Sequence, residues 1–250
     1  MLAKTFNHCT VFSEYMGDGG IRILLVASWG NPSEWRPARY RLPLQSVFHE
    51  GLRRSLEAKL QGVEVCLSNC STLALASLLK RASVEVEMLV FGLDTLVQPA
   101  SSGDLRKRAE EAYRGFAEKF IRECSCCSIL ERGEEPPVRV VVTPGMGMFH
   151  GYAYKGSPVH IFNVAFSRIL ESVERFEPTF IVVGITHGVN YQMTAILYAT
   201  MAAAALTGMD GRVEIFGTLP QEARGGPSSA RMAIGHGLFP HEAYPSATAV

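Results

Sequence analysis

The chain has 250 residues, of which 47% are hydrophobic and 19% are charged, and this balance is ordinary for a soluble protein with a substantial buried core. Its 24 Lys and Arg residues equal its 24 Asp and Glu residues, so the formal net charge is zero. A protein of long nucleic acids usually carries a broad basic face, which this composition does not indicate. The neutral composition is compatible with a small phosphate-bearing ligand, because backbone N–H groups and a few local cations can hold it.

The opening residues 1–20 are polar and weakly patterned, and we expect them to form an added arm or hairpin. They lack the continuous apolar core of a secretory signal. The longest apolar helix candidate, Tyr191–Leu206, is Ala-rich and short for a membrane span. We therefore expect a cytoplasmic protein without a membrane partner.

Short aliphatic runs alternate with helical patterns between residues 21 and 217. The predicted strands are Ile21–Ala27, Val63–Leu67, Val84–Phe91, Val138–Val142, Phe180–Ile185 and Val213–Phe216. The predicted helices are Leu44–Leu60, Thr72–Lys80, Asp104–Glu123, Phe162–Arg175 and Tyr191–Leu206. The strands are apolar throughout, as in a parallel sheet that helices cover on both faces. The sequence therefore predicts an α/β domain over residues 21–217, with a Rossmann-like, doubly wound and mostly parallel sheet.

The end of the chain differs in composition from this domain. After Phe216 the sequence shifts to Gly, Pro, Ser and Ala, with the run Gly225–Ser229 inside it. We expect residues 218–250 to form an irregular tail, either wrapped over the domain or partly disordered.

The six cysteines are Cys9, Cys66, Cys70, Cys124, Cys126 and Cys127. Cys66 lies in an apolar, strand-like run, which favours a buried free thiol. The cluster from Cys124 to Cys127 has no second cysteine pair and no nearby histidine to complete a zinc set. We therefore expect no metal site.

Polar loops follow four of the predicted strands, and these loops are Ser28–Trp35, Ser68–Thr72, Thr143–Phe149 and Thr186–Tyr191. Ligands of open parallel sheets bind beyond the carboxyl ends of the strands, where the topology changes direction. Glycines there permit close backbone approach, and N–H groups that open a helix can hold phosphate. Aromatic and amide side chains can stack on a base or bond its edge. The predicted ligand-binding residues are Ser28, Trp29, Gly30, Asn31, Ser71, Thr72, Gly145, Met146, Gly147, Thr186, His187, Gly188, Asn190 and Tyr191.

Structural roles remain open for several of these side chains. Trp29 and Trp35 could cap the core, and Ser71, Thr72 and Asn190 could serve only as helix caps.

Two classes of enzyme fit the loops poorly. His187 has no Ser or Cys partner at nucleophile-elbow spacing, which argues against a hydrolase triad. A dinucleotide-binding oxidoreductase would carry its glycine fingerprint after the first strand, where this chain has the segment Trp29–Pro32 instead. We therefore expect no cofactor.

The segment Ile185–Tyr191, with the sequence ITHGVNY, closely resembles the strand-end signature of CRISPR-associated Rossmann-fold (CARF) sensor domains. Ala27–Pro32, followed by Trp35 and Tyr40, is similar to the first loop of that family, and Thr143–Gly147 to its glycine loop. The resemblance covers residues 21 to 217 and looks closest to the sensor domains of HEPN-type ribonucleases in type III CRISPR systems. The chain departs from the family at Gly184, where members often carry an acidic residue.

The resemblance implies that two copies of the chain share a cleft that binds cyclic oligoadenylate, most often the four-membered ring. A ring of four identical nucleotides has a twofold axis that can coincide with the axis of a dimer. Binding would shift the dimer toward the active arrangement of an attached or associated nuclease effector in antiviral defence.

Arg231 and His236 have the spacing of a HEPN ribonuclease motif. The Gly- and Pro-rich segment after Phe216 is too short for a helical HEPN domain, so we expect this match to be accidental and the chain to lack that nuclease.

Two other functions remain open. The chain could be a ring nuclease that cleaves its own ligand, with His187, Ser28 and Lys155 as the catalytic candidates. It could also be a structural or regulatory partner that pairs through its sheet edge and tail without binding nucleotide.

Overall fold

The computed structural model describes residues 20–41, 53, 65–99, 103–131, 138–221 and 229–236. The strands are β1 (Arg22–Ser28), β2 (Ala38–Arg41), β3 (Val65–Ser68), β4 (Glu85–Leu93), β5 (Arg139–Thr143), β6 (Met146–Phe149), β7 (Tyr152–Lys155), β8 (Phe180–Gly184), β9 (Val213–Gln221) and β10 (Ser229–His236). The α-helices are α3 (Ser71–Arg81), α4 (Leu105–Glu123), α5 (Pro158–Phe176) and α6 (Asn190–Leu206). Short 3-10 helices are η1 (Pro32–Glu34), η3 (Asp94–Leu96), η4 (Cys127–Glu131) and η5 (Asp210–Arg212).

One sheet of the described chain contains eight strands in the order β3-β2-β10-β9-β8-β1-β4-β5. The five neighbours from β9 to β5 are all parallel. Among the parallel strands, β4 and β5 lie on one side of β1, and the chain then returns through α5 to β8 and β9 on the other side. The topology therefore changes direction beside β1, which confirms the predicted Rossmann-like, doubly wound fold.

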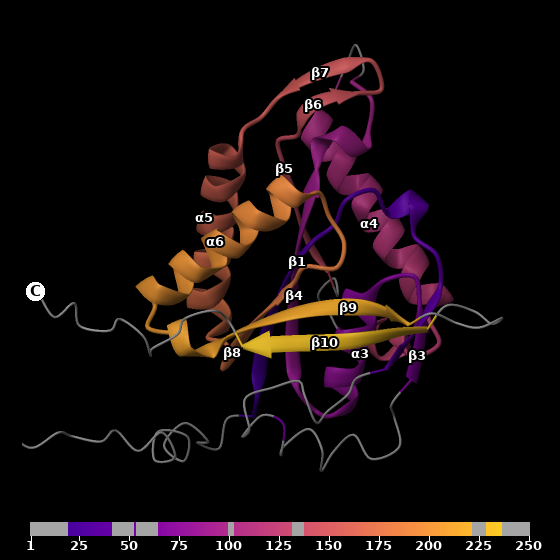
Figure 1. Ribbon diagram of the computed structural model, residues 1–250, viewed down its shortest axis with the longest axis vertical. Coiled ribbons are helices and arrows are strands. Elements are labelled where there is room, and N and C mark those ends of the chain that lie inside the picture. Colours follow the sequence, from indigo (N-terminus) through magenta and orange to yellow (C-terminus); the bar gives the residue numbers. More distant parts are fainter. Residues whose placement is uncertain are drawn as a thin grey trace, which may run out of the picture.

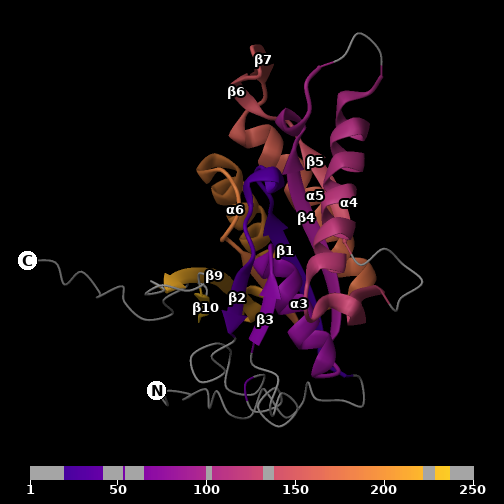
Figure 2. The same cartoon turned by 90° about the vertical axis from the view of Figure 1, so that its right-hand side faces the viewer.

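Helices cover both faces of the parallel strands. Alternate residues of β1 point to opposite faces, so Ile23 and Leu25 join the core beneath α3 and α4, whereas Leu24 and Val26 join the core beneath α5 and α6. Figure 1 shows α5 and α6 on one side of β1 and β4 and shows α4 on the other, and Figure 2 gives the view from the side of α4. Because both faces are covered, these strands are mostly apolar. They are not apolar throughout as expected, since β4 carries Glu85 and Glu87 and β9 carries Glu214.

The segment that follows β5 is not a plain loop. β6 and β7 form an antiparallel hairpin whose two turn residues, His150 and Gly151, have φ of 54° and 81°. Positive φ at both central residues matches the right-handed twist of a tight hairpin. The hairpin projects beyond the main sheet at the top of Figure 1. The sequence did not predict this hairpin, because each of its strands has only four residues and the segment contains two glycines.

The structure differs from the expected irregular tail. β9 continues to Gln221, and Ser229–His236 form β10, which pairs antiparallel with β9 and parallel with β2. Backbone pairing with existing strands stabilises β10 despite its weak strand pattern. Arg231 and His236 therefore lie in a sheet strand and not on a helix.

The expectation of a free thiol at Cys66 is wrong. Cys66 is bonded to Cys126, Cys124 is bonded to Cys127, and Cys70 is the free cysteine of the described residues. The sequence could not show that β3 lies beside the end of α4.

Two predicted segments cannot be compared. The expected arm over residues 1–20, except Gly20, and the predicted helix Leu44–Leu60, except Arg53, lie outside the described residues. Among the helices that the structure describes, none has the length and hydrophobicity needed to cross a bilayer.

Candidate functional site

The loop that follows β1 lies against the loop that follows β8, where the sheet topology changes direction. A Cβ atom built on Gly30 would lie 3.3 Å from Gly188 Cα, and one built on Gly188 would lie 2.3 Å from Ser28 Oγ. Gly188 also has a φ of +153°, which L side chains rarely adopt. Glycine at positions 30 and 188 therefore allows the two loops to approach closely.

Gln192, in the first turn of α6, connects this meeting point to the neighbouring strands. Ser28 Oγ donates to Gln192 Oε1 at 2.8 Å, and Gln192 Nε2 donates to Phe91 O at 3.2 Å and to Thr143 Oγ1 at 3.3 Å. The side chain of Gln192 is fully buried. The sequence showed only a polar residue within an Ala-rich helix, so this role was missed.

His187 lies in a stack of aromatic rings. Its imidazole stacks on Trp35 with ring centroids 4.1 Å apart, and Trp35 stacks in turn on Phe120 of α4. Burial lowers the pKa of His187 to about 4, so the imidazole is neutral near pH 7. A neutral imidazole can hydrogen-bond to a base or a ribose, but it brings no positive charge to a phosphate.

The predicted residue Gly145 packs against Asp94 and Thr95, which the sequence analysis did not single out. Its N–H donates to Asp94 Oδ1 at 2.7 Å, and a Cβ atom on Gly145 would lie 2.1 Å from Thr95 Cγ2. Burial raises the pKa of Asp94, while the hydrogen bond from Gly145 opposes that shift. A cavity of about 460 Å³ opens beside this pair, and its lining includes the cationic side chains Arg106 and Lys155.

Several buried polar atoms of the predicted site have no hydrogen-bond partner. They are Trp29 Nε1, Ser71 Oγ, Thr186 Oγ1 and His187 Nε2. The Tyr191 hydroxyl, close to the Met146 backbone, is also buried without a hydrogen bond of good geometry. Buried polar groups are nearly always paired in folded proteins, so the unpaired atoms of Thr186 and His187, which are neighbours in one loop, are exceptions.

The structure does not present every predicted residue to a ligand. The Trp29 side chain is fully buried in the core, in edge contact with Trp35, so it offers no free face to a base. Ser71 and Thr72 are buried at the start of α3, and no hydrogen bond within the described chain joins them to the His187 loop. Asn31 is exposed, where it caps η1.

The remaining predicted residues lie at the rim of the site. Asn190 is exposed at the start of α6, and Tyr191 is half-buried behind it. In β6, Met146 is half-buried and Gly147 is exposed.

The three catalytic candidates do not form one constellation. The Ser28 hydroxyl is buried and donates to Gln192, while Lys155 is exposed at the end of β7 and lines the cavity beside Gly145. Within the described residues, no hydrogen bond joins either side chain to His187. The geometry therefore gives no specific support for ring cleavage by these residues.

A doubly wound α/β domain with a polar, glycine-lined site at the topological switch point belongs to the class of Rossmann-like ligand-binding domains. A family profile described as "CRISPR system endoribonuclease Csx1, CARF domain" matches residues 24–220. The chain therefore belongs to this CARF family and is a CRISPR sensor-domain protein of type III systems.

No curated protein matches the chain. Similar solved structures include a deacetylase of teicoplanin biosynthesis as a triple mutant, in complex with teicoplanin, and in complex with bog, at 14%, 11% and 14% identity. These matches cover 79% of this chain and 63%, 69% and 66% of the deacetylase chains, with TM-scores of 0.35, 0.36 and 0.34. At these TM-scores the likeness gives no information on function.

Proposed function

We propose that this chain is a cytoplasmic sensor that binds cyclic tetra-adenylate in a cleft shared by two copies of the chain. Occupancy of the cleft controls a nuclease effector that is attached to the sensor or associated with it. Membership in the CARF family supports the class of ligand.

The observation that carries this proposal is the set of unpaired buried polar atoms where the β1 and β8 loops meet. Thr186 Oγ1 and His187 Nε2 lack partners there. Adenine and ribose offer donors and acceptors that match such neutral groups. The cations Arg106 and Lys155 line the cavity beside Gly145 and are available for phosphate oxygens. A strongly basic protein is therefore not required.

A second copy of the chain is supported by symmetry and by the surface of α6. A cyclic tetranucleotide has a twofold axis, so two identical loop sets can each bind half of the ring. α6 begins at the site and exposes the large hydrophobic side chains Tyr198 and Leu206, which are 61% and 67% exposed. The second copy is proposed to cover these two side chains.

Calorimetric titration of the purified chain with cyclic tetra-adenylate tests the proposal. We expect saturable binding with about one ring for two chains. His187→Ala and Asn190→Ala are expected to weaken binding by about tenfold or more, equal to about 1.4 kcal/mol, while the dimer stays intact. Glu118→Ala is the control, because Glu118 is exposed on α4 and belongs to none of the site loops.

Two results would overturn the proposal: no binding by a folded protein, or unchanged affinity in both site variants. Chromatography of the same mixtures separates sensing from cleavage. An intact ring supports a sensor, whereas a linear product with a 2′,3′-cyclic phosphate would assign ring nuclease activity to the chain.

A further inference from the structure

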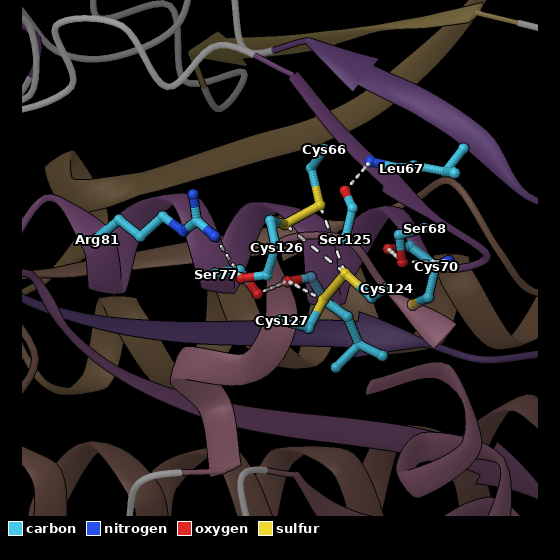
Figure 3. Close-up of a disulfide and its surroundings, with 11 residues drawn as sticks. Cys66, Leu67, Ser68, Cys70, Ser77, Arg81, Cys124, Ser125, Cys126 and Cys127 are labelled. Atoms are coloured by element: carbon cyan, nitrogen blue, oxygen red, sulfur yellow. Dashed lines mark hydrogen bonds between the residues drawn. A yellow bond between two sulfur atoms is a disulfide. The ribbon is translucent and has the colours of Figure 1, made fainter. Parts of the chain in front are cut away.

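Four cysteines gather in one buried cluster beside the edge strand β3. Cys66 comes from β3, whereas Cys124, Cys126 and Cys127 follow α4 directly. Their sulfur atoms all lie within 4.8 Å of one another. Figure 3 shows the two pairs of sulfur atoms side by side. The most exposed member, Cys124, is only 9% exposed.

The backbone holds the two cysteine-bearing segments together. Ser125 N–H donates to Leu67 O at 2.9 Å. Leu67 N–H donates in turn to Ser125 Oγ at 2.9 Å, as Figure 3 shows. Because Leu67 follows Cys66 and Ser125 follows Cys124, these bonds bring the cysteines together whatever the chemical state of their sulfur atoms.

The sulfur atoms are joined in the structure as Cys66–Cys126 and Cys124–Cys127, but the packing does not select this pairing. Cys124 Sγ also lies 3.5 Å from Cys66 Sγ and 3.7 Å from Cys126 Sγ. The Cys124–Cys127 bond joins residues only 3 apart in sequence, and cross-links of short loops remove little entropy from the unfolded chain. The Cys66–Cys126 bond closes a loop of 60 residues and has a clear stabilising role, but the second disulfide explains poorly why Cys124 and Cys127 join the cluster.

A single metal ion would explain why all four cysteines lie together. Structural zinc is commonly bound by four cysteine thiolates in a tetrahedron with Zn–S of about 2.3 Å, which places the sulfur atoms about 3.8 Å apart. The separations of 3.5 and 3.7 Å around Cys124 Sγ are close to this value. We propose that Cys66, Cys124, Cys126 and Cys127, in their reduced form, bind one structural Zn²⁺ ion.

The surroundings suit such a site. Binding releases the four thiol protons and leaves a tetrathiolate centre with a formal charge of about −2. The basic end of α3 lies beside it, since Arg81 donates to Cys126 O at 3.3 Å (Figure 3). Four protein ligands leave no open coordination position, so the ion would join β3 to the end of α4 and would not act on a substrate.

This inference is independent of the proposed ligand. From the sequence, the cysteines at 124–127 lacked a fourth ligand. Cys66 lies 58 residues before Cys124 and supplies that ligand.

Metal analysis tests the proposal on the full chain, produced with zinc in the medium and purified with a phosphine reductant and no chelator. We expect about one zinc ion per chain. Cys66→Ser should lower the zinc content below about a tenth of an equivalent. Cys70→Ala is the matched control and should retain zinc, because Cys70 is a buried free cysteine outside the cluster.

Thermal unfolding distinguishes zinc from disulfides. A zinc site predicts that a chelator lowers the Tm while a reductant does not, and disulfides predict the reverse. Cobalt exchange into the unmodified chain should give the visible absorption of a tetrahedral cobalt thiolate, which keeps the proposal testable if Cys66→Ser does not fold. Less than about a tenth of an equivalent of zinc, together with no cobalt absorption, overturns the proposal.

Discussion

Gln192 ties the ends of three strands to α6 through one buried side chain. It accepts a hydrogen bond from Ser28 and donates to Phe91 O and Thr143 Oγ1. We expect Gln192→Met to lower the free energy of unfolding by about 1–3 kcal/mol, because the variant leaves the buried Ser28 hydroxyl without its partner. Urea denaturation followed by circular dichroism measures this change.

Thr200→Val is the matched control on the same helix. Thr200 is also fully buried, but its hydroxyl donates only to Ile196 O within α6. The expected change is within about 1 kcal/mol. Equal stability of Gln192→Met and the unmodified chain would show that the network does not stabilise the strand ends.

His187 makes the stability of the fold depend on pH. Burial lowers its folded-state pKa from 6.5 to about 4, so the unfolded chain binds more protons than the folded chain between these values. Stability therefore rises with pH across this window and falls as the pH drops from 6.5 toward 4. Acidification from pH 7 to pH 4.5 should lower the free energy of unfolding by about 2–3 kcal/mol through the protonation of His187.

The control for this effect is His187→Gln, which cannot titrate. Urea denaturation of both proteins at several pH values should show a smaller acid loss in His187→Gln, because other groups are common to both. Parallel pH profiles would contradict the assignment of the effect to His187.

α4 is anchored to the strand ends by the hydroxyl of Tyr113. This hydroxyl donates to Gly30 O at 2.8 Å and accepts a hydrogen bond from Leu93 N–H at 2.9 Å. The ring fits only because residue 92 is glycine, where a Cβ atom would lie 2.1 Å from Tyr113 Cε2. One helix thereby positions the loop after β1 and the end of β4 together.

Tyr113→Phe should keep the packing of α4 and remove this anchor. We expect a loss of about 1–3 kcal/mol in the free energy of unfolding, since Leu93 N–H stays buried without a partner. Hydrogen exchange should show faster exchange at Leu93. Tyr198→Phe is the control on an exposed tyrosine of α6 and should leave the unfolding free energy unchanged; equal effects of the two variants would refute the anchor.

The proposed shared cleft requires that two copies of the chain form a dimer. Light scattering after size exclusion should give about twice the mass of one chain, with and without cyclic tetra-adenylate. Tyr198→Glu places a charge on the exposed apolar surface of α6 and should shift the equilibrium toward monomer. A strictly monomeric chain in the presence of saturating ring would exclude a shared cleft.

The amino-acid sequence by itself determined the five strands of the parallel sheet, the helices α3 to α6, and the placement of the loops after β1 and β8 at one edge. Strands such as Phe180–Gly184 are apolar throughout, and helices such as α4 carry one apolar face, so local pattern is sufficient to predict them. Parallel strands that alternate with helices place their carboxyl ends on one edge. The segment Thr186–Tyr191 could therefore be located at this edge of the sheet from the sequence alone.

Only the tertiary structure decided which distant side chains meet. Ser28 and Gln192 are 164 residues apart, Cys66 and Cys124 are 58 apart, and β10 pairs with strands from both ends of the chain. The core position of Trp29 was likewise settled by how α4 packs on the sheet. Such contacts depend on the packing of whole elements, and the local sequence around each residue has no periodic pattern that reports them.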